Sequence, residues 1–291
     1  MKSPTTKPYI LLAKEAPIAI LIAKKGSKKY HIIKWNLETD EFEYGSWFHG
    51  TIYNLKTDLS FDGKYMVYFA MGDGHSMRSN LYCWTAICEP PFLKAKILYD
   101  HLDTWHGGGI FWGDDGKQLF LEAFNHPLAR KQSENKITDD EFTKKYIIKT
   151  TVEEYPFPQW KFSWIFYYRL LRNGWKDVST GQTKYDFLDN RSETRDALEF
   201  EKIILNYKLR MKLKFDWIKH GMYHLCDYFL FDDKNNLINI IDNTVIWADV
   251  DVFGRLIFVK NGIVYRCEKD NLFNFSPIID CNILQPPTSQ K

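Results

Sequence analysis

The stretch that decides the fold is Leu59-Ser60-Phe61-Asp62-Gly63-Lys64, followed at once by Tyr65-Met66-Val67-Tyr68-Phe69-Ala70. The Asp-Gly pair tolerates the positive φ angle that a tight turn requires. The apolar run that follows is typical of a buried β-strand. We therefore expect a β-hairpin whose turn contains Gly63 and whose second strand lies in the protein core.

The same pattern recurs further along the chain. Trp112-Gly113-Asp114-Asp115-Gly116-Lys117 precedes the apolar run Leu119-Phe120-Leu121, and Asp249-Val250-Asp251-Val252-Phe253-Gly254 precedes Leu256-Ile257-Phe258-Val259. A second class of turn separates an aromatic strand from a more polar one. These turns are expected at residues 35–40, 90–91, 172–175, 232–236 and 270–271. Short strands closed by turns in this way indicate hairpins in series.

Counting both classes of turn gives roughly five repeats of about 40 to 50 residues, which is the size of a β-propeller blade. Blade boundaries are expected near residues 50, 104, 181 and 243. The chain has 291 residues, a length that closed all-β architectures often reach as one domain. Aromatic residues, which are favoured on pleated strands, make up 16% of the chain. The sequence therefore predicts an all-β fold, a single β-propeller of about five four-stranded blades over residues 1–291.

Two segments interrupt the repeat. Residues 124–160 are rich in charge and are expected to form an insertion, with one or two helical turns from Asp139 to Tyr146. The segment from Asn190 to Leu205 is ambiguous. Asn190 and Glu193 have the spacing of a capping box, which predicts a short helix, whereas Phe200 to Phe215 alternates as strands do.

The residues of the first turn carry a family resemblance. Asp58-Leu59-Ser60-Phe61-Asp62-Gly63-Lys64 resembles the WD40-like repeat of TolB-type propellers, which reads S-P-D-G-K, with Phe61 in place of the proline. Trp47 to Tyr53, Tyr68 to Ala70 and Trp84 to Ile87 with Pro90-Pro91 follow the order of motifs in a group of uncharacterised bacterial proteins. The similarity is clearest over residues 45–122 and 247–270. The resemblance implies a propeller fold and no particular activity.

Charge and cysteine content limit the partners that we expect. The formal net charge is +2, from 39 Lys and Arg against 37 Asp and Glu, which argues against nucleic acid or anionic lipid as a partner. The five cysteines include no CxxC pair, so we expect reduced thiols and no cofactor. The apolar run Tyr9 to Ala13 is short for a signal peptide, and no run approaches the roughly 20 residues of a membrane span. We expect a cytoplasmic protein.

The segment His106-Gly107-Gly108-Gly109 looks like the oxyanion-hole loop of lipases and esterases. Such an enzyme also needs a G-x-S-x-G motif to expose its nucleophile, and the sequence has none. The preferred interpretation is that the glycines let the backbone pass close to a neighbouring blade at the start of an inner strand. We therefore expect no catalytic residue in this loop.

Two groups of residues have some of the character of a metal site. His220 and His224 would share one face of a helix or of a strand, but the glutamate of the zinc-protease motif is absent between them. Asp100, His101, Asp103 and His106 cluster in a loop between two expected blades. A structural histidine pair and solvated turn residues are the favoured interpretations, so no bound metal is expected.

The absence of a catalytic or cofactor motif favours a non-catalytic, protein-binding propeller. An immunity or antitoxin-like protein that binds a toxin is one example of this class. The alternative is a hydrolase-type enzyme with its site at the mouth of the propeller channel, where His49, Asp103 and His106 are the candidate residues.

The expected interface with a protein partner is the insertion and its C-terminal flank. The candidate contact residues are Phe142, Tyr146, Tyr155 and Trp160, because aromatic residues in a polar surround are typical of interfaces. The alternative is that these aromatic residues hold the insertion against the third blade. A second candidate is the run Lys208 to Lys214, which alternates charged and apolar residues and is best explained as a half-exposed strand.

Overall fold

The computed structural model describes residues 5–73, 82–101, 104, 106–122, 140–150, 164–179, 198–214, 225–238 and 240–286. The chain divides into two compact units. The first consists of residues 1–159 and 283–291, and the second of residues 160–282.

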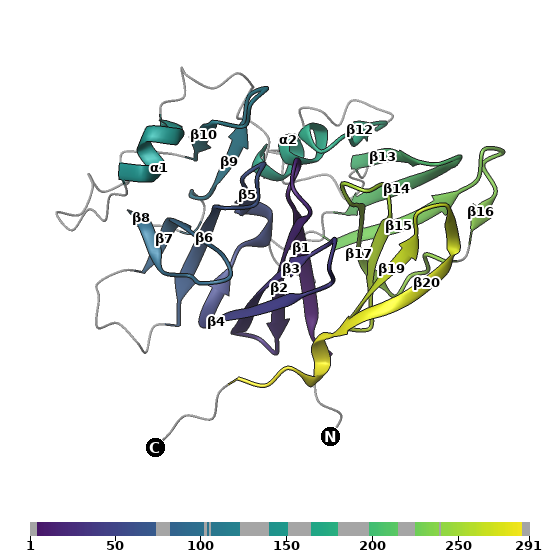
Figure 1. The fold of residues 1–291 in the computed structure, drawn as a ribbon, viewed down its shortest axis with the longest axis horizontal. Coiled ribbons are helices and arrows are strands. Elements are labelled where there is room, and N and C mark those ends of the chain that lie inside the picture. The colour runs from purple at the N-terminus through teal and green to yellow at the C-terminus, as the bar shows by residue number, and fades with distance from the viewer. Residues whose placement is uncertain are drawn as a thin grey trace, which may run out of the picture. The chain divides into compact units, whose positions relative to one another are not determined.

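The first unit begins with antiparallel strands that follow one another in chain order (Figure 1). The first four are β1 (Lys7–Leu12), β2 (Ile18–Lys25), β3 (Lys29–Asn36) and β4 (Phe42–Ile52). A turn of 3-10 helix, η1 (Asn54–Lys56), then leads to β5 (Asp58–Leu59), β6 (Met66–Gly72), β7 (Cys83–Cys88) and β8 (Ala95–His101). The long strand β4 pairs with β3 through its first part and with β6 through its end, so it joins the two strand groups.

The core of this unit lies between these two groups of strands. On β2, Ile20, Leu21 and Ile22 are each 0% exposed, because both faces of this strand are covered. Ile20 and Ile22 belong to one hydrophobic cluster with Met66 and Tyr68 of β6. An apolar run that is buried on both faces is the pattern expected of an inner strand.

The predicted Asp-Gly hairpins are confirmed. The turn from Ser60 to Lys64 joins β5 to β6, and Gly63 has a φ of 71°. The second turn joins β9 (Gly109–Trp112) to β10 (Gln118–Leu121), with Gly116 at a φ of 65°. The third joins β17 (Val245–Val250) to β18 (Leu256–Lys260), with Gly254 at 81°. Only glycine adopts such angles without strain, which explains why each of these turns carries one.

A smaller sheet follows in the first unit. It contains β9 (Gly109–Trp112), β10 (Gln118–Leu121) and β11 (Ile147–Lys149), with helix α1 (Asp140–Lys145) directly before β11. The helical turns expected from Asp139 to Tyr146 are therefore confirmed. Strand β11 was not predicted; it pairs in parallel with β10, so the end of the insertion returns to the sheet.

The second unit contains helix α2 and two antiparallel sheets. One sheet is formed by β12 (Lys176–Asp177), β13 (Leu198–Ile204), β14 (Tyr207–Lys214), β15 (Leu225–Phe231) and β16 (Leu237–Ile238). The other is formed by β17 (Val245–Val250), β18 (Leu256–Lys260), β19 (Ile263–Glu268) and β20 (Asn271–Asp280), whose strands lie side by side in this order (Figure 1). A 3-10 turn, η5 (Cys281–Ile283), follows β20.

One predicted turn, at residues 172–175, is wrong because these residues end helix α2 (Trp164–Arg172). Residues 172–175 do not join two strands; they end this helix, with Gly174 at a φ of 87° and the Trp175 N–H donating to the Leu170 carbonyl. The helix was missed because aromatic and apolar residues fill Trp164 to Leu171 almost without a break, as in a buried strand. The next strand group begins at Lys176, before the boundary expected near residue 181.

The other predicted turns are confirmed. The turn at 35–40 joins β3 to β4, Pro90-Pro91 joins β7 to β8, 232–236 joins β15 to β16, and 270–271 joins β19 to β20. The alternation seen from Phe200 onward is confirmed by β13 and β14. The capping box at Asn190 lies outside the described residues.

The predicted fold class is confirmed: the chain is an all-β protein built from successive antiparallel strand groups of the kind that form propeller blades. The blade count of about five, and one closed domain over residues 1–291, stay predictions. Within the described residues, no helix is long and apolar enough to span a membrane.

Candidate functional site

The aromatic residues proposed for a partner interface lie in two different situations. Phe142 is 0% exposed and Tyr146 is 4% exposed, and both pack in a cluster with Tyr65 and Phe111. Phe142 stacks on Tyr146 and meets Tyr65 edge to face. These two residues therefore hold α1 against the strands, which is the alternative that the sequence left open. Tyr155 and Trp160 lie outside the described residues.

The candidate histidines of the channel mouth are placed on separate elements. His49 lies on β4 and is exposed, with its Nδ1 atom 2.5 Å from Oδ2 of Asp73. His106 lies in the loop before β9, and Asp103, His220 and His224 lie outside the described residues. Among the side chains that the structure describes, no group of three or more His, Cys, Asp or Glu could hold a metal ion.

The triple-glycine loop is closely packed, as the sequence predicted. A Cβ atom on Gly107 would lie 2.3 Å from the Phe69 ring, and one on Gly108 would lie 2.1 Å from the Lys56 carbonyl oxygen. Both contacts are shorter than real Cβ atoms tolerate, so the loop passes directly against β6 and η1. The N–H of Gly108 donates to Thr85 Oγ1 at 2.7 Å, and that of Gly107 donates to Glu122 at 3.2 Å. These two N–H groups therefore have partners inside the fold and do not face a substrate.

The buried polar side chains around this loop also have structural partners. Thr85, which is 0% exposed, lies 2.8 Å from the His101 Nε2 atom. Asp58, which is 1% exposed, accepts the Phe111 N–H at 2.8 Å and so links β5 to β9. A buried polar group costs stability unless it is hydrogen-bonded, and these groups satisfy one another. They join neighbouring strand groups and offer no open site.

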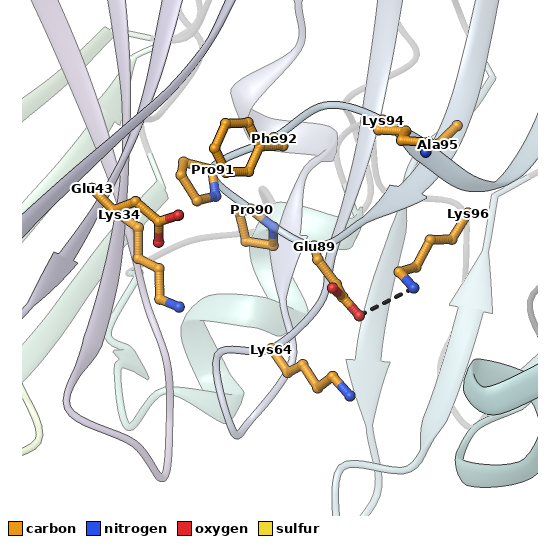
Figure 2. A pocket seen from close by; sticks show the side chains of 10 residues that line it. All are labelled: Lys34, Glu43, Lys64, Glu89, Pro90, Pro91, Phe92, Lys94, Ala95 and Lys96. Carbon is orange, nitrogen blue, oxygen red and sulfur yellow. Dashed lines mark ion pairs between the residues drawn. The ribbon is translucent and has the colours of Figure 1, made fainter.

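An open pocket of about 710 Å³ lies elsewhere in the first unit, between the β3–β4 pair and the β7–β8 corner (Figure 2). We call it the lysine pocket. It is lined by Lys34, Glu43, Lys64, Glu89, Pro90, Pro91, Phe92, Lys94, Ala95 and Lys96. Figure 2 shows Lys34 and Glu43 on one side, Lys94 and Lys96 on the other, and the prolines between them.

Backbone contacts fix the two sides of the lysine pocket relative to each other. The Ser46 N–H donates to the Pro91 carbonyl at 3.0 Å, and the Leu93 N–H donates to the Ser46 hydroxyl at 3.0 Å. A Cβ atom on Gly45 would lie 2.1 Å from the Pro91 carbonyl oxygen, so glycine is needed for this approach. The Pro90-Pro91 corner is therefore held against β4, and the pocket has rigid walls.

The lysine pocket carries more positive than negative charge, with four lysines and two glutamates. Glu89 forms an ion pair with Lys96 at 3.2 Å. Within the described part of the chain, Lys34 and Lys94 form no ion pair, although Lys34 lies opposite Glu43 in the strand register. Their ammonium groups therefore remain available for an anionic ligand.

The fourth lysine connects the pocket to the insertion. Lys64 Nζ lies 2.7 Å from Glu141 of α1, and the hydrogen bond that it donates to this carboxylate raises the pKa of Lys64. Helix α1 is anchored at the same turn, where Lys145 lies 2.5 Å from Asp62. Burial alone would raise the pKa of Asp62, but hydrogen bonds from Lys145 and Ser60 outweigh it, and the pKa is lowered. Lys64 thus links the lysine pocket to the insertion through Glu141.

The pocket also offers apolar surface. Phe92 is 51% exposed at the rim, next to the ring of Pro91. An exposed aromatic side chain beside ammonium groups can pack against an apolar side chain while lysines bind nearby carboxylates. The described lining residues include no Ser, Cys or His, and they combine ammonium groups, carboxylates and an exposed ring.

Sequence reasoning missed this pocket because its lysines are scattered from residue 34 to residue 96. The sequence identified Pro90-Pro91 as a turn, which is correct, but nothing local shows that this turn packs on β4. The only local pattern is that Lys94 and Lys96 follow Phe92 at alternate positions, and of these three residues Lys96 alone lies within β8.

Comparison with known proteins gives little further guidance. No family model matches the chain, and no curated protein sequence matches it. Among solved structures, the β-propeller domain of the Trilobed protease from Pyrococcus furiosus is 11% identical and has a TM-score of 0.33, covering 95% of this chain and 84% of that one. Prolyl oligopeptidase B from Galerina marginata is 12% identical with a TM-score of 0.26, covering 95% of this chain and 34% of that one. Likenesses at this level carry no argument about function.

Proposed function

We propose that this protein is a non-catalytic, protein-binding module and that the lysine pocket docks an acidic, extended segment of its partner. The observation that carries the proposal is the combination of two lysines without an ion pair, Lys34 and Lys94, with the exposed ring of Phe92 in one rigid-walled pocket. A toxin bound by an immunity protein is one example of such a partner.

The charges are expected to give selectivity more than affinity. An exposed ion pair contributes only about 0.2–1 kcal/mol, so two of them alone cannot hold a partner. Burial of apolar surface contributes about 25 cal/mol per Å², which makes Phe92 the expected anchor of the interface. Lys34 and Lys94 would then favour acidic over basic segments by their charge.

The alternative function, hydrolysis at the channel mouth, has weaker support. The N–H groups of Gly107 and Gly108 have partners inside the fold, and His106 belongs to a loop that packs against β6. Neither His49 nor His106 is among the described residues that line the lysine pocket.

Fluorescence anisotropy with labelled peptides tests the proposal. One peptide contains glutamate and phenylalanine residues, and its control carries lysine in place of glutamate. We expect the acidic peptide to bind the intact protein and the basic peptide not to bind. The double variant Lys34→Glu/Lys94→Glu should weaken binding of the acidic peptide by about tenfold or more, equivalent to about 1.4 kcal/mol.

The matched control is the double variant Lys234→Glu/Lys269→Glu, which makes the same charge change at two exposed turns of the second unit. It should leave the peptide affinity unchanged. A second variant, Phe92→Ala, should weaken binding of the acidic peptide without changing the preference for acidic over basic sequences. Equal affinity of the intact protein and the Lys34→Glu/Lys94→Glu variant would overturn the proposal.

A further inference from the structure

A second positively charged site lies at the hairpin between β2 and β3. Its sequence is Lys24-Lys25-Gly26-Ser27-Lys28-Lys29, with four lysines in six residues. Gly26 turns the chain with a φ of 67°, and residues 26–29 are exposed. The small net charge of the whole chain conceals this local concentration, because charged residues elsewhere balance it.

Two pairs of like charges face each other across the strands at this end of the sheet. Lys24 lies opposite Lys7 of β1, and Lys25 lies opposite Lys29 of β3. Burial and the nearby charge of Lys7 lower the pKa of Lys24. Like charges placed directly opposite each other destabilise a sheet. Adjacent residues of a strand point to opposite faces, so an anion beside Lys25 and Lys29, which line the pocket described next, would relieve the repulsion of that pair alone.

The hairpin borders a pocket of about 350 Å³, which we call the hairpin pocket. It is lined by Lys25, Gly26, Ser27, Lys28, Lys29, His49, Gln285 and Pro286. Lys25 Nζ donates a hydrogen bond to the Leu284 carbonyl, which holds the segment that carries Gln285 against the hairpin. The pocket therefore has two walls that are far apart in the sequence, and the lining residues that the structure describes include no carboxylate.

One lining side chain is held in a fixed orientation. Asp73, whose side chain is 8% exposed, lies 2.5 Å from the Nδ1 atom of His49, whose side chain is 57% exposed. As an imidazolium, which carries both N–H groups, the His49 ring donates through Nδ1 to the Asp73 carboxylate and presents its Nε2–H to an anion. Asp73 thus acts as a positioning residue for the His49 ring, and its carboxylate is paired with that ring.

We propose that the hairpin pocket binds a phosphoryl anion, with Lys28, Lys29 and His49 as its donors. A phosphoryl group has several acceptor oxygens and a concentrated negative charge, which several lysines and an imidazole N–H can satisfy together. A merely solvated hairpin tip would explain the exposed lysines, but it would not explain the oriented histidine or the wall built from residues 285 and 286. The site has no exposed aromatic anchor among its lining residues, so it suits a small charged group.

The probe for a free anion is inorganic pyrophosphate, titrated by isothermal calorimetry at low salt. We expect binding by the intact protein and a loss of at least tenfold in affinity for the variant Lys28→Gln/Lys29→Gln. The variant His49→Gln should also weaken binding, because it removes an oriented donor. Lys234→Gln/Lys269→Gln, at two exposed turns of the second unit, makes an equal change in charge and should leave pyrophosphate affinity unchanged.

A phosphoryl group could also belong to a lipid headgroup, so the second arm uses vesicles. Phosphatidylcholine vesicles with a phosphatidylinositol phosphate are compared with phosphatidylcholine alone in a sedimentation assay. Binding of pyrophosphate alone identifies a free anion, and binding to the phosphoinositide vesicles identifies a headgroup.

Melting temperatures of all variants show whether they fold, and residues 28 and 29 are exposed, so folding should be retained. Absence of binding in both arms overturns the proposal. Unchanged pyrophosphate binding by a folded Lys28→Gln/Lys29→Gln variant also overturns it. The peptide experiments on the lysine pocket are independent of either result, so failure of one proposal does not affect the other.

Discussion

A comparison of two glycines with nearly the same backbone conformation gives the sharpest test of the fold. Gly63 has a φ of 71° and Gly26 has a φ of 67°, so a Cβ atom is strained at both positions. Their surroundings differ. A Cβ atom on Gly63 would lie 2.8 Å from Cβ of Ile18, whereas one on Gly26 would have nothing within 4 Å. The substitutions Gly63→Ala and Gly26→Ala therefore share the strain and differ in the steric contact.

The expected magnitudes follow from these two terms. Left-handed backbone costs a non-glycine residue about 1–2 kcal/mol, which is the whole effect expected for Gly26→Ala. Inserting a methyl group into a closely packed site adds about 1–3 kcal/mol, so Gly63→Ala should destabilise the protein by about 2–5 kcal/mol. Both glycines lie in the first compact unit, which makes the comparison direct.

Urea denaturation followed by tryptophan fluorescence measures both variants. With a slope of about 2–3 kcal/mol per M, the additional cost should lower the midpoint of Gly63→Ala by about 0.3–1.5 M relative to Gly26→Ala. Equal midpoints for the two variants would refute the packing of the Ser60 to Lys64 turn against Ile18. An unchanged midpoint for both relative to the parent would refute the left-handed turns themselves.

Three other outcomes are expected. Phe142→Ala should lower the free energy of unfolding by about 3–5 kcal/mol, because this ring is 0% exposed in the core, and a loss below about 1 kcal/mol would contradict its placement. The Lys260 ammonium lowers the pKa of Asp242 from 3.8 to about 2, so this pair should stabilise the fold above pH 4 and lose its contribution as the pH falls toward 2; the carboxyl resonance of Asp242 in a nuclear magnetic resonance titration reports the midpoint. Burial raises the pKa of Cys267 and Cys281 to about 12, so neither thiol should react with Ellman's reagent at pH 8 until urea unfolds the protein.

The turns could be predicted from the sequence because each depends on a few consecutive residues. In the first hairpin, Asp62 accepts the Lys64 N–H at 3.1 Å, and the Tyr65 N–H donates to Ser60 Oγ at 2.9 Å. All of these partners lie within the quoted stretch. The helix α2 could not be recognised in this way, because its Trp, Tyr and Phe residues favour strands when they are considered locally.

The candidate site could not be predicted because it depends on contacts between distant parts of the chain. Lys34 and Lys94 reach one pocket only because the Pro90-Pro91 corner packs against Gly45. The aromatic residues of the insertion are the opposite case, because the sequence predicted an interface where the structure has a buried cluster. In the sequence, Phe142 is an aromatic residue among polar ones, as is typical of an interface. In the structure it is buried in a cluster with Tyr65 and Phe111. Exposure is decided by tertiary packing, which local composition does not report.

Asp62 takes part both in the local turn and in the packing of the insertion. Its Oδ1 atom lies 2.6 Å from the Ser60 hydroxyl and completes the turn, while its Oδ2 atom lies 2.5 Å from Lys145 of the insertion. A residue that the sequence marks only as part of a turn thus also fixes helix α1. Because α1 carries Glu141 to Lys64, this anchor determines how much positive charge the lysine pocket presents. The turn that decides the fold therefore also sets the charge of the surface that we propose binds a partner.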